Sequence, residues 1–298
     1  GEYATLGERK VAISQVDLIT HDTDGNRLVR TSETNLGNLC ADAVRYAMDA
    51  DVGYMNGGGL RAAIQNGDIT FNDLLSVFPF NNTVVLAEVS GQTLKDMMEM
   101  AVMSWPAEDG SFPHLSGITF SVNTAIPSSV VVNELEEFVE ISGEYRVYDI
   151  EVFDKETGKY EPLSLSKTYT LAASNYFLLE YGSGMTMLKD AKIIQNEGML
   201  DVEALERYIV EALGGTIGEE YAEVKNNITF TEGIIEDPVD NNNQENEENN
   251  NQENQENNNQ GENDQKQPKD TIYIVWIIVA VVGVSILIVT VIVIKKRR

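Results

Sequence analysis

The 298-residue sequence is poor in the residues that build disulfides and metal centres. It has one cysteine, Cys40, so it cannot form a disulfide within the chain, and it has only two histidines, His21 and His114. The histidines lie far apart and neither stands in a His/Asp/Glu pattern with ligand spacing, so we expect no metal site in this chain. We interpret Cys40 as a small buried hydrophobe of a helix, and His114 as a loop residue rather than a general base.

Motifs of nucleophilic and phosphate-transfer chemistry are missing as well. The sequence has no G-x-S-x-G elbow, no P-loop and no G-x-G-x-x-G, so we expect no catalytic residue in it. Positive charge is scarce, with 21 Lys and Arg against 48 Asp and Glu and a formal net charge of −27. Nucleic acid is therefore excluded as a partner, because no basic field exists to displace its counterions. An anionic ligand must be held by a few local arginines.

The last part of the sequence does not have the composition of a folded domain. Residues 236–270 are almost entirely Asn, Gln, Glu and Asp, which predicts a disordered tether because such a segment buries little apolar surface. Residues 271–294 predict one transmembrane helix: residues 272–294 carry no charge and span about 34 Å as a helix, enough to cross a bilayer core. The basic residues 295–298 predict a cytoplasmic end and a folded part on the outer face of a cell membrane.

These features point to a bacterial surface. An outward-facing domain without disulfides is typical of a Gram-positive cell, where a sortase can cut a Pro-containing pentapeptide before such an apolar stretch. Residues 267–271 hold the proline but not the Thr-Gly pair at which sortases cut, so we favour a retained anchor. The sequence begins without Met or a secretion signal, and we expect it to be the C-terminal part of a longer protein.

The order of apolar patterns predicts an α+β domain with a mixed β-sheet over residues 27–235, preceded by an approach segment, residues 1–26. A loop is expected over residues 106–116. Thr34 or Ser32 and Ser90 are the expected helix caps. Helices are predicted at residues 35–50, 72–78, 92–105 and 201–213 and near Asn175, and strands at residues 11–16, 51–55, 83–89, 117–122, 145–153 and 169–173.

The most informative segment is Asn56-Gly57-Gly58-Gly59-Leu60-Arg61. Consecutive glycines can adopt positive φ and let backbone N–H groups approach a ligand closely. Asn56 and Arg61 add amide groups and a planar cation that suit the polar edges and phosphates of a nucleotide. Alone, such a triplet more often forms a plain turn.

Together with four further segments, this turn resembles the C-terminal domain of the 5'-nucleotidase and UDP-sugar hydrolase family. The resemblance covers about residues 27–227 and implies that this domain binds the nucleoside of a nucleotide. It also implies a separate N-terminal metallophosphoesterase domain that holds two divalent metal ions and cleaves the phosphate, so that no cofactor is expected in the present chain. The further segments are Glu33-Thr34-Asn35-Leu36-Gly37-Asn38-Leu39, Phe78-Pro79-Phe80-Asn81-Asn82-Thr83, Gly110-Ser111-Phe112-Pro113 with Ser116-Gly117, and Asn175-Tyr176-Phe177 before Gly182-Ser183-Gly184.

The resemblance also implies which residues bind. Phe80 and Phe177 match the two aromatic residues that clamp the base, and the alternative is that they are ordinary core phenylalanines. Asn56, with Gly58 beside it, and Arg61 match residues that contact the ribose or base edge and the phosphates. Arg30 matches a phosphate-binding arginine, with a solvated strand-end charge as the alternative.

The sequence departs from the family at one turn. Where the family has Gly-Gly-Asp-Gly, this chain has Tyr181-Gly182-Ser183-Gly184, so Ser183 replaces an aspartate that accepts hydrogen bonds from the ribose hydroxyls. The aromatic residue that follows in the family is Met185 here. These changes put the affinity and the sugar preference in question.

The sequence therefore predicts the nucleotide-binding domain of a surface-anchored phosphohydrolase that converts extracellular nucleotides to nucleosides and phosphate. The alternative is a catalytically degenerate surface module for ligand binding or adhesion. A related phosphohydrolase with another substrate, such as a cyclic nucleotide or a thiosulfate carrier, is a third reading.

Overall fold

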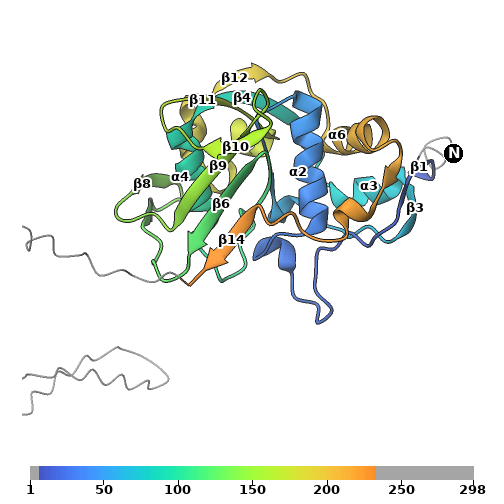
Figure 1. Ribbon diagram of the computed structural model, residues 1–298, viewed down its shortest axis with the longest axis horizontal. Helices are drawn as coiled ribbons and strands as arrows, with labels where there is room; N and C mark the ends of the chain where they lie inside the picture. Colours follow the sequence, from blue (N-terminus) through green and yellow to red (C-terminus); the bar gives the residue numbers. More distant parts are fainter. Residues whose placement is uncertain (1–6, 233–298) are drawn as a thin grey trace, which may run out of the picture. The chain divides into compact units, whose positions relative to one another are not determined.

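The computed structural model describes residues 7–232 (Figure 1), which fall within the first of two compact units, Gly1–Pro238. The expected tether, transmembrane helix and basic end lie outside the described residues. Within residues 7–232, no helix combines the length and the apolar character that crossing a bilayer requires.

A five-stranded mixed sheet forms the centre of the domain, and it matches the predicted α+β class. In order across the sheet, the strands are β12 (Lys192–Gln195), β4 (Val84–Ser90), β11 (Thr168–Ser174), β2 (Val52–Asn56) and β5 (Pro113–Ser116). Strands β11 and β2 are parallel to each other, and the other neighbouring pairs, β12–β4, β4–β11 and β2–β5, are antiparallel.

The sheet separates two hydrophobic cores, because successive side chains of a strand point to opposite faces. Along β4, Val84 and Leu86 belong to one core, and Val85 and Ala87 belong to the other. Helix α2 (Asn35–Met48) contributes to the first core with α3 (Phe71–Val77) and α6 (Asp201–Arg207), whereas α4 (Gly91–Ala101) contributes to the second. Figure 1 shows α2 beside α6. Burial of both faces explains why β4 reads as a nearly continuous apolar run.

Smaller sheets complete the domain. One has the order β10 (Lys159–Pro162), β9 (Val147–Asp154), β6 (Ile118–Asn123) and β14 (Ile228–Thr231), and another has the order β13 (Thr216–Ile217), β1 (Lys10–Ser14) and β3 (Gly67–Thr70). Strands β7 (Val130–Val132) and β8 (Phe138–Ile141) form a two-stranded sheet.

Local capping explains where the helices begin. Thr34 accepts a hydrogen bond from the backbone N–H of Gly37 at 3.1 Å, and Ser90 accepts one from Thr93 at 3.0 Å. These side chains satisfy N–H groups that lack a partner in the first turn. The structure therefore confirms the predicted caps Thr34 and Ser90 and the helices that follow them.

One expectation about local structure was wrong. Residues 113–116 form strand β5 instead of a loop, so His114 is a strand residue. The helix predicted at residues 201–213 is confirmed over residues 201–212, where it is α-helical to Arg207 and continues as a π-helix over Tyr208–Ala212. The short strands β3, β7, β8, β10, β12, β13 and β14 were not predicted.

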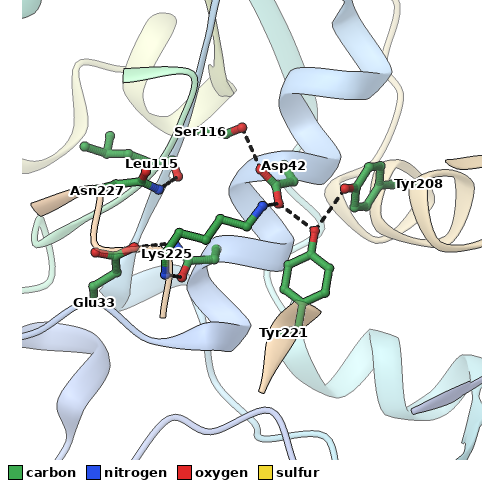
Figure 2. A network of polar contacts seen from close by, with 9 residues as sticks. Glu33, Asp42, Leu115, Ser116, Tyr208, Tyr221, Lys225 and Asn227 are labelled. Atoms are coloured by element: carbon green, nitrogen blue, oxygen red, sulfur yellow. Dashed lines mark hydrogen bonds and ion pairs between the residues drawn. The ribbon is translucent and has the colours of Figure 1, made fainter. Parts of the chain in front are cut away.

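A polar network fastens the end of the domain to α2 (Figure 2). Asp42 of α2 accepts hydrogen bonds from Ser116 Oγ at 2.6 Å and from the Tyr221 hydroxyl at 2.6 Å, and it forms an ion pair with Lys225. The Tyr208 hydroxyl lies 2.9 Å from that of Tyr221. Burial and the negative charge of Asp42 raise the pKa of Tyr221, which therefore stays protonated and donates to the carboxylate.

The segment of residues 221–228, which holds Tyr221 and Lys225, is also hydrogen-bonded to Glu33 and to β5. Asn227 Nδ2 donates to the Leu115 carbonyl of β5 at 2.8 Å (Figure 2). Glu33, just before α2, accepts from Asn38 Nδ2 at 2.6 Å and from the backbone N–H of Ile228 at 3.2 Å. Residues 221–228 thus hold α2 and β5 together.

Candidate functional site

Four loops meet at one edge of the central sheet. Strands β2 and β11 are parallel neighbours, so their carboxyl ends lie at the same edge. Strands β4 and β5 run antiparallel to them, so these two strands begin there. This topology brings together residues that are far apart in the sequence: Asn56 to Gly59 after β2, Phe80 to Asn82 before β4, Gly110 before β5, and Tyr176 to Ser183 after β11.

A cavity of about 360 Å³ opens between these loops. Of the seven predicted site residues, five line it, whereas Arg61 and Phe177 do not. The lining contains no Asp or Glu, although the chain as a whole is strongly acidic. The lining residues are Arg30, Asn56, Gly58, Gly59, Phe80, Asn82, Gly110, Tyr176 and Ser183.

Two aromatic rings line the cavity, but only one of them is a predicted ring. Phe80 is 54% exposed and Tyr176 is 36% exposed. Phe177 is fully buried, with its ring centroid 5.1 Å from that of Tyr54 and 5.1 Å from that of Tyr176. The prediction that Phe177 contacts a ligand is therefore corrected: its ring belongs to the hydrophobic core, and the preceding residue, Tyr176, lines the cavity.

The turn that follows Tyr176 is built around its hydroxyl group. The backbone N–H of Ser183 donates to the Tyr176 hydroxyl at 3.0 Å. Gly182 allows the ring to approach, because a Cβ there would collide with it. Ser183 has a φ of 54°, and Met185 is fully buried in the core instead of forming a wall of the cavity. The turn thus fixes the orientation of Tyr176.

The loop that carries Phe80 is hydrogen-bonded directly to the short helix α5 (Asn175–Leu178), which carries Tyr176 and confirms the helix predicted near Asn175. The backbone N–H of Thr83 donates to Asn175 Oδ1 at 2.8 Å, and the backbone N–H of Asn175 donates to the Thr83 carbonyl at 2.8 Å. The backbone N–H of Asp201 also donates to the Asn82 carbonyl at 3.0 Å. The two rings therefore stand on one hydrogen-bonded frame.

We call the glycine triplet Gly57–Gly59 the floor of the cavity, because Gly58 and Gly59 line it and Gly57 adjoins them. The reason for glycine at these positions differs from the one expected. Gly57 to Gly59 form a short 3-10 helix, η2 (Gly57–Gly59), and are not among the positive-φ residues of the described chain. Glycine is required by close packing: a Cβ on Gly57 would collide with the Val29 carbonyl, and one on Gly58 would lie 3.0 Å from the Gly110 carbonyl. The expectation of positive φ was wrong, whereas close backbone approach explains the residues.

The orientation of the Asn56 amide is fixed by its neighbours. Asn56 Nδ2 donates to the Gly110 carbonyl at 2.8 Å, and the backbone N–H of Gly58 donates to the same oxygen at 2.9 Å. That carbonyl then has both lone pairs engaged. Asn56 Oδ1 is left as an acceptor for a ligand.

Two arginines bring positive charge to the cavity: Arg30 lines it, and Arg61 lies beside Phe80. Arg30 belongs to the 3-10 turn η1 (Leu28–Arg30), and its Nε is buried with no hydrogen-bond partner in the described part of the chain. Burial, and then the charges of Arg27 and Arg61, lowers the pKa of the Arg30 guanidinium. Arg61 is exposed outside the lining, and its guanidinium carbon lies 5.6 Å from the centre of the Phe80 ring. An anion bound beside Arg30 would relieve the mutual repulsion of these cations.

Residues 7–232 contain no group of three or more His, Cys, Asp or Glu side chains that could hold a metal ion. His114 is fully buried, and burial lowers its pKa to about 4. The ring is therefore neutral near pH 7.

Sequence reasoning missed Tyr176, Asn82, Gly59 and Gly110 as lining residues. Asn175-Tyr176 lies just beyond the strand predicted at residues 169–173, and that position could have identified Tyr176. The resemblance to the family motif instead pointed to Phe177, one residue further along. Gly110 carries no local signal, because its role depends on pairing with Asn56, 54 residues earlier.

Comparison with known proteins defines the class. The family model of the 5'-nucleotidase C-terminal domain matches residues 11–190, and the chain belongs to this family. This finding confirms the resemblance seen in the sequence motifs.

Individual relatives agree with this assignment. The chain is 32% identical over 209 residues to the trifunctional nucleotide phosphoesterase YfkN of Bacillus subtilis, covering 68% of the chain and 13% of YfkN. It is 28% identical over 225 residues to a 5'-nucleotidase of Diplobatis ommata, covering 71% of the chain and 36% of that protein. The chain thus spans well under half the length of these relatives.

The solved structure of a 5'-nucleotidase precursor from Thermus thermophilus has the same fold. The TM-score is 0.64 at 27% identity, over 78% of the chain and 41% of that protein. Haemophilus influenzae NAD nucleotidase, at 19% identity and a TM-score of 0.60 over 77% of the chain and 39% of that protein, shares the fold.

Proposed function

We propose that this chain is the nucleotide-binding part of a 5'-nucleotidase-type phosphohydrolase. The observation that carries the proposal is one cavity lined by two partly exposed rings, Phe80 and Tyr176, and by the cation Arg30. A planar base can stack on aromatic rings, with about 1 to 3 kcal/mol per base. An arginine fork matches the oxygens of a phosphate.

The remaining polar groups suit the parts of the ligand between base and phosphate. Asn56 Oδ1 can accept a hydrogen bond from an amino or hydroxyl group, and Ser183 Oγ can accept or donate one. Arg61 lies over the Phe80 ring, where it supports this ring and adds positive charge near the phosphate end.

The proposal extends to the whole protein by analogy with the relatives. A further N-terminal metallophosphoesterase domain of the same polypeptide would carry the catalytic residues, and two divalent metal ions would supply the activated water there. The full protein would release nucleosides and phosphate from extracellular nucleotides. The apolar residues 271–294 and the basic residues 295–298 support an anchor in the cell membrane of a Gram-positive bacterium, with the domain outside.

One observation favours the alternative of a catalytically degenerate binding module. Ser183 gives the lining a neutral hydroxyl group where the family has a carboxylate, so the sugar is held less firmly. A test with AMP and Mn²⁺ discriminates between the two functions: release of phosphate by the complete polypeptide would support the phosphohydrolase, and its absence would support the degenerate binding module.

Calorimetric titration of the 298-residue chain with AMP tests the binding proposal. Phe80→Ala and Tyr176→Ala should each weaken AMP binding by about tenfold, because each removes a stacking surface. Phe177→Leu is the matched control: it should lower the stability of the core and leave the affinity for AMP within about twofold. Unchanged affinity in the double variant Phe80→Ala/Tyr176→Ala would refute the stacking site.

A further inference from the structure

His114 is a buried histidine behind the cavity that no step of the proposed binding uses. It lies on β5, paired with Met55 of β2, and is fully buried. Its Nε2 lies 3.0 Å from the carbonyl oxygen of Val29, the residue before Arg30. A carbonyl oxygen can only accept, so Nε2 carries the hydrogen and donates. Nδ1 is then the unprotonated nitrogen, and it is buried without a hydrogen-bond partner among residues 7–232.

Keeping this ring in place has two costs. A buried nitrogen without a partner costs about 1 to 3 kcal/mol, a penalty that an apolar side chain of similar size would avoid. The ring also requires a glycine in the first turn of α2, because a Cβ on Gly37 would collide with Nδ1. A glycine in a helix costs about 1 kcal/mol relative to alanine. Among residues 7–232, the ring makes one hydrogen bond, to Val29, and this bond is the compensation.

The Val29 carbonyl lies at the junction between the arginine turn and the floor of the cavity. It fills the space that a Cβ of Gly57 would need. On the other side of Arg30, the backbone N–H of Asp109 donates to the Arg30 carbonyl at 3.0 Å. The turn Leu28–Arg30 is therefore held by His114 at one peptide group and by Asp109 at the next.

We propose that His114 is a positioning residue for phosphate recognition: its hydrogen bond to Val29 holds the turn Leu28–Arg30 against Gly57 and so places the Arg30 guanidinium at the cavity. The inference rests on the proposed function, since it takes Arg30 as the group that binds the phosphate. His114 does not line the cavity and acts only through the backbone of Val29.

The test compares AMP with adenosine, which lacks the phosphate, in calorimetric titrations of the 298-residue chain. His114→Leu removes the donor, whereas the Nε2 of His114→Gln is as many bonds from the backbone as the imidazole Nε2 and can still donate. His114→Leu should weaken AMP binding about tenfold and adenosine binding less than about twofold. His114→Gln should bind AMP within about threefold of the unmodified chain.

Gly37→Ala provides a second variant if His114→Leu does not fold. It crowds the ring without removing it, and it should reduce the affinity for AMP selectively, as His114→Leu does. Equal losses for AMP and adenosine in either variant would overturn the proposal, because they are the sign of general packing. An unchanged affinity for AMP in His114→Leu would overturn it too. Absence of binding of either ligand by the unmodified chain would instead refute the proposed function, on which this inference depends.

Discussion

The cavity and the Asp42 network are both polar and partly buried, yet their hydrogen bonds are distributed in opposite ways. Asp42 accepts hydrogen bonds from Ser116 of β5 and from Tyr221, and it forms an ion pair with Lys225 of the same segment as Tyr221. At the cavity, Arg30 Nε has no hydrogen-bond partner in the described residues, and Asn56 uses only its amide nitrogen. A satisfied network stabilises the fold, whereas unused hydrogen-bonding capacity at a cavity leaves room for a ligand.

The largest expected effect tests the structural half of this comparison. Asp42→Ala should lower the free energy of unfolding by about 3 kcal/mol, because it leaves the hydroxyl groups of Ser116 and Tyr221 without their acceptor, whereas the partly exposed Lys225 can be solvated by water. Chemical denaturation measures this loss. The folded variant should still bind AMP like the unmodified chain, and a loss of affinity at retained stability would contradict the division between the two regions.

Two buried titratable groups near the cavity give the next effect. Burial lowers the pKa of His114 to about 4, so the unfolded chain binds a proton first as the pH falls below 6.5, and stability decreases toward pH 4. Burial raises the pKa of Asp201 to about 7, so the native chain keeps a proton that the unfolded chain loses, and stability decreases as the pH rises from about 4 toward 7. The two contributions have opposite signs and nearly cancel.

Single variants should separate these contributions. Between about pH 4.5 and 6.5, the free energy of unfolding should rise by about 2 to 3 kcal/mol in Asp201→Asn and fall by a similar amount in His114→Gln. Denaturation at each pH measures both slopes. Identical slopes in the two variants would show that neither group is responsible.

The sequence predicted those parts of the fold whose causes are local. The apolar period of α2 and α4 and the caps Thr34 and Ser90 act within a few residues, and they were found. Short strands such as β13 and β14 form through pairing with distant strands, and nothing within a few residues reveals that.

The same distinction applies to the site. Phe80, Asn56 and Arg30 were identified from motifs, and all three line the cavity. Phe177 was chosen from the family motif, but Tyr176 and Phe177 are neighbours in the short helix α5 (Asn175–Leu178), and the motif does not show which of the two rings faces the cavity. Successive helix residues point in different directions, so one ring lines the cavity and the next is buried in the core.

Arg30→Gln tests the ligand half of the comparison. It should weaken AMP binding by about 2 kcal/mol, or roughly thirtyfold, because a hydrogen-bonded charge is lost. Adenosine should bind as before, and the free energy of unfolding should not fall, since glutamine avoids the cost of burying the charged guanidinium and relieves its repulsion from Arg27 and Arg61. Equal effects on AMP and adenosine would show that Arg30 does not bind the phosphate.

The smallest effect concerns the turn of Ser183. Ser183→Asp should increase the affinity for AMP by about 1 kcal/mol, since a carboxylate accepts stronger hydrogen bonds from ribose hydroxyls. Aspartate also tolerates the φ of 54° found there. Deoxyadenosine monophosphate is the control ligand, and a gain of equal size for it would show that the effect does not involve the 2'-hydroxyl.

The glycine floor determines which parts of the site can be varied. Gly57 and Gly58 are packed against the carbonyl groups of Val29 and Gly110, so neither position accepts a side chain without moving the backbone. A new ligand preference can therefore arise by substitution of Asn56, Asn82, Tyr176 or Ser183 but not by reshaping the floor. Directed evolution of this domain toward other bases or sugars should accumulate changes at those four positions and leave the glycines untouched.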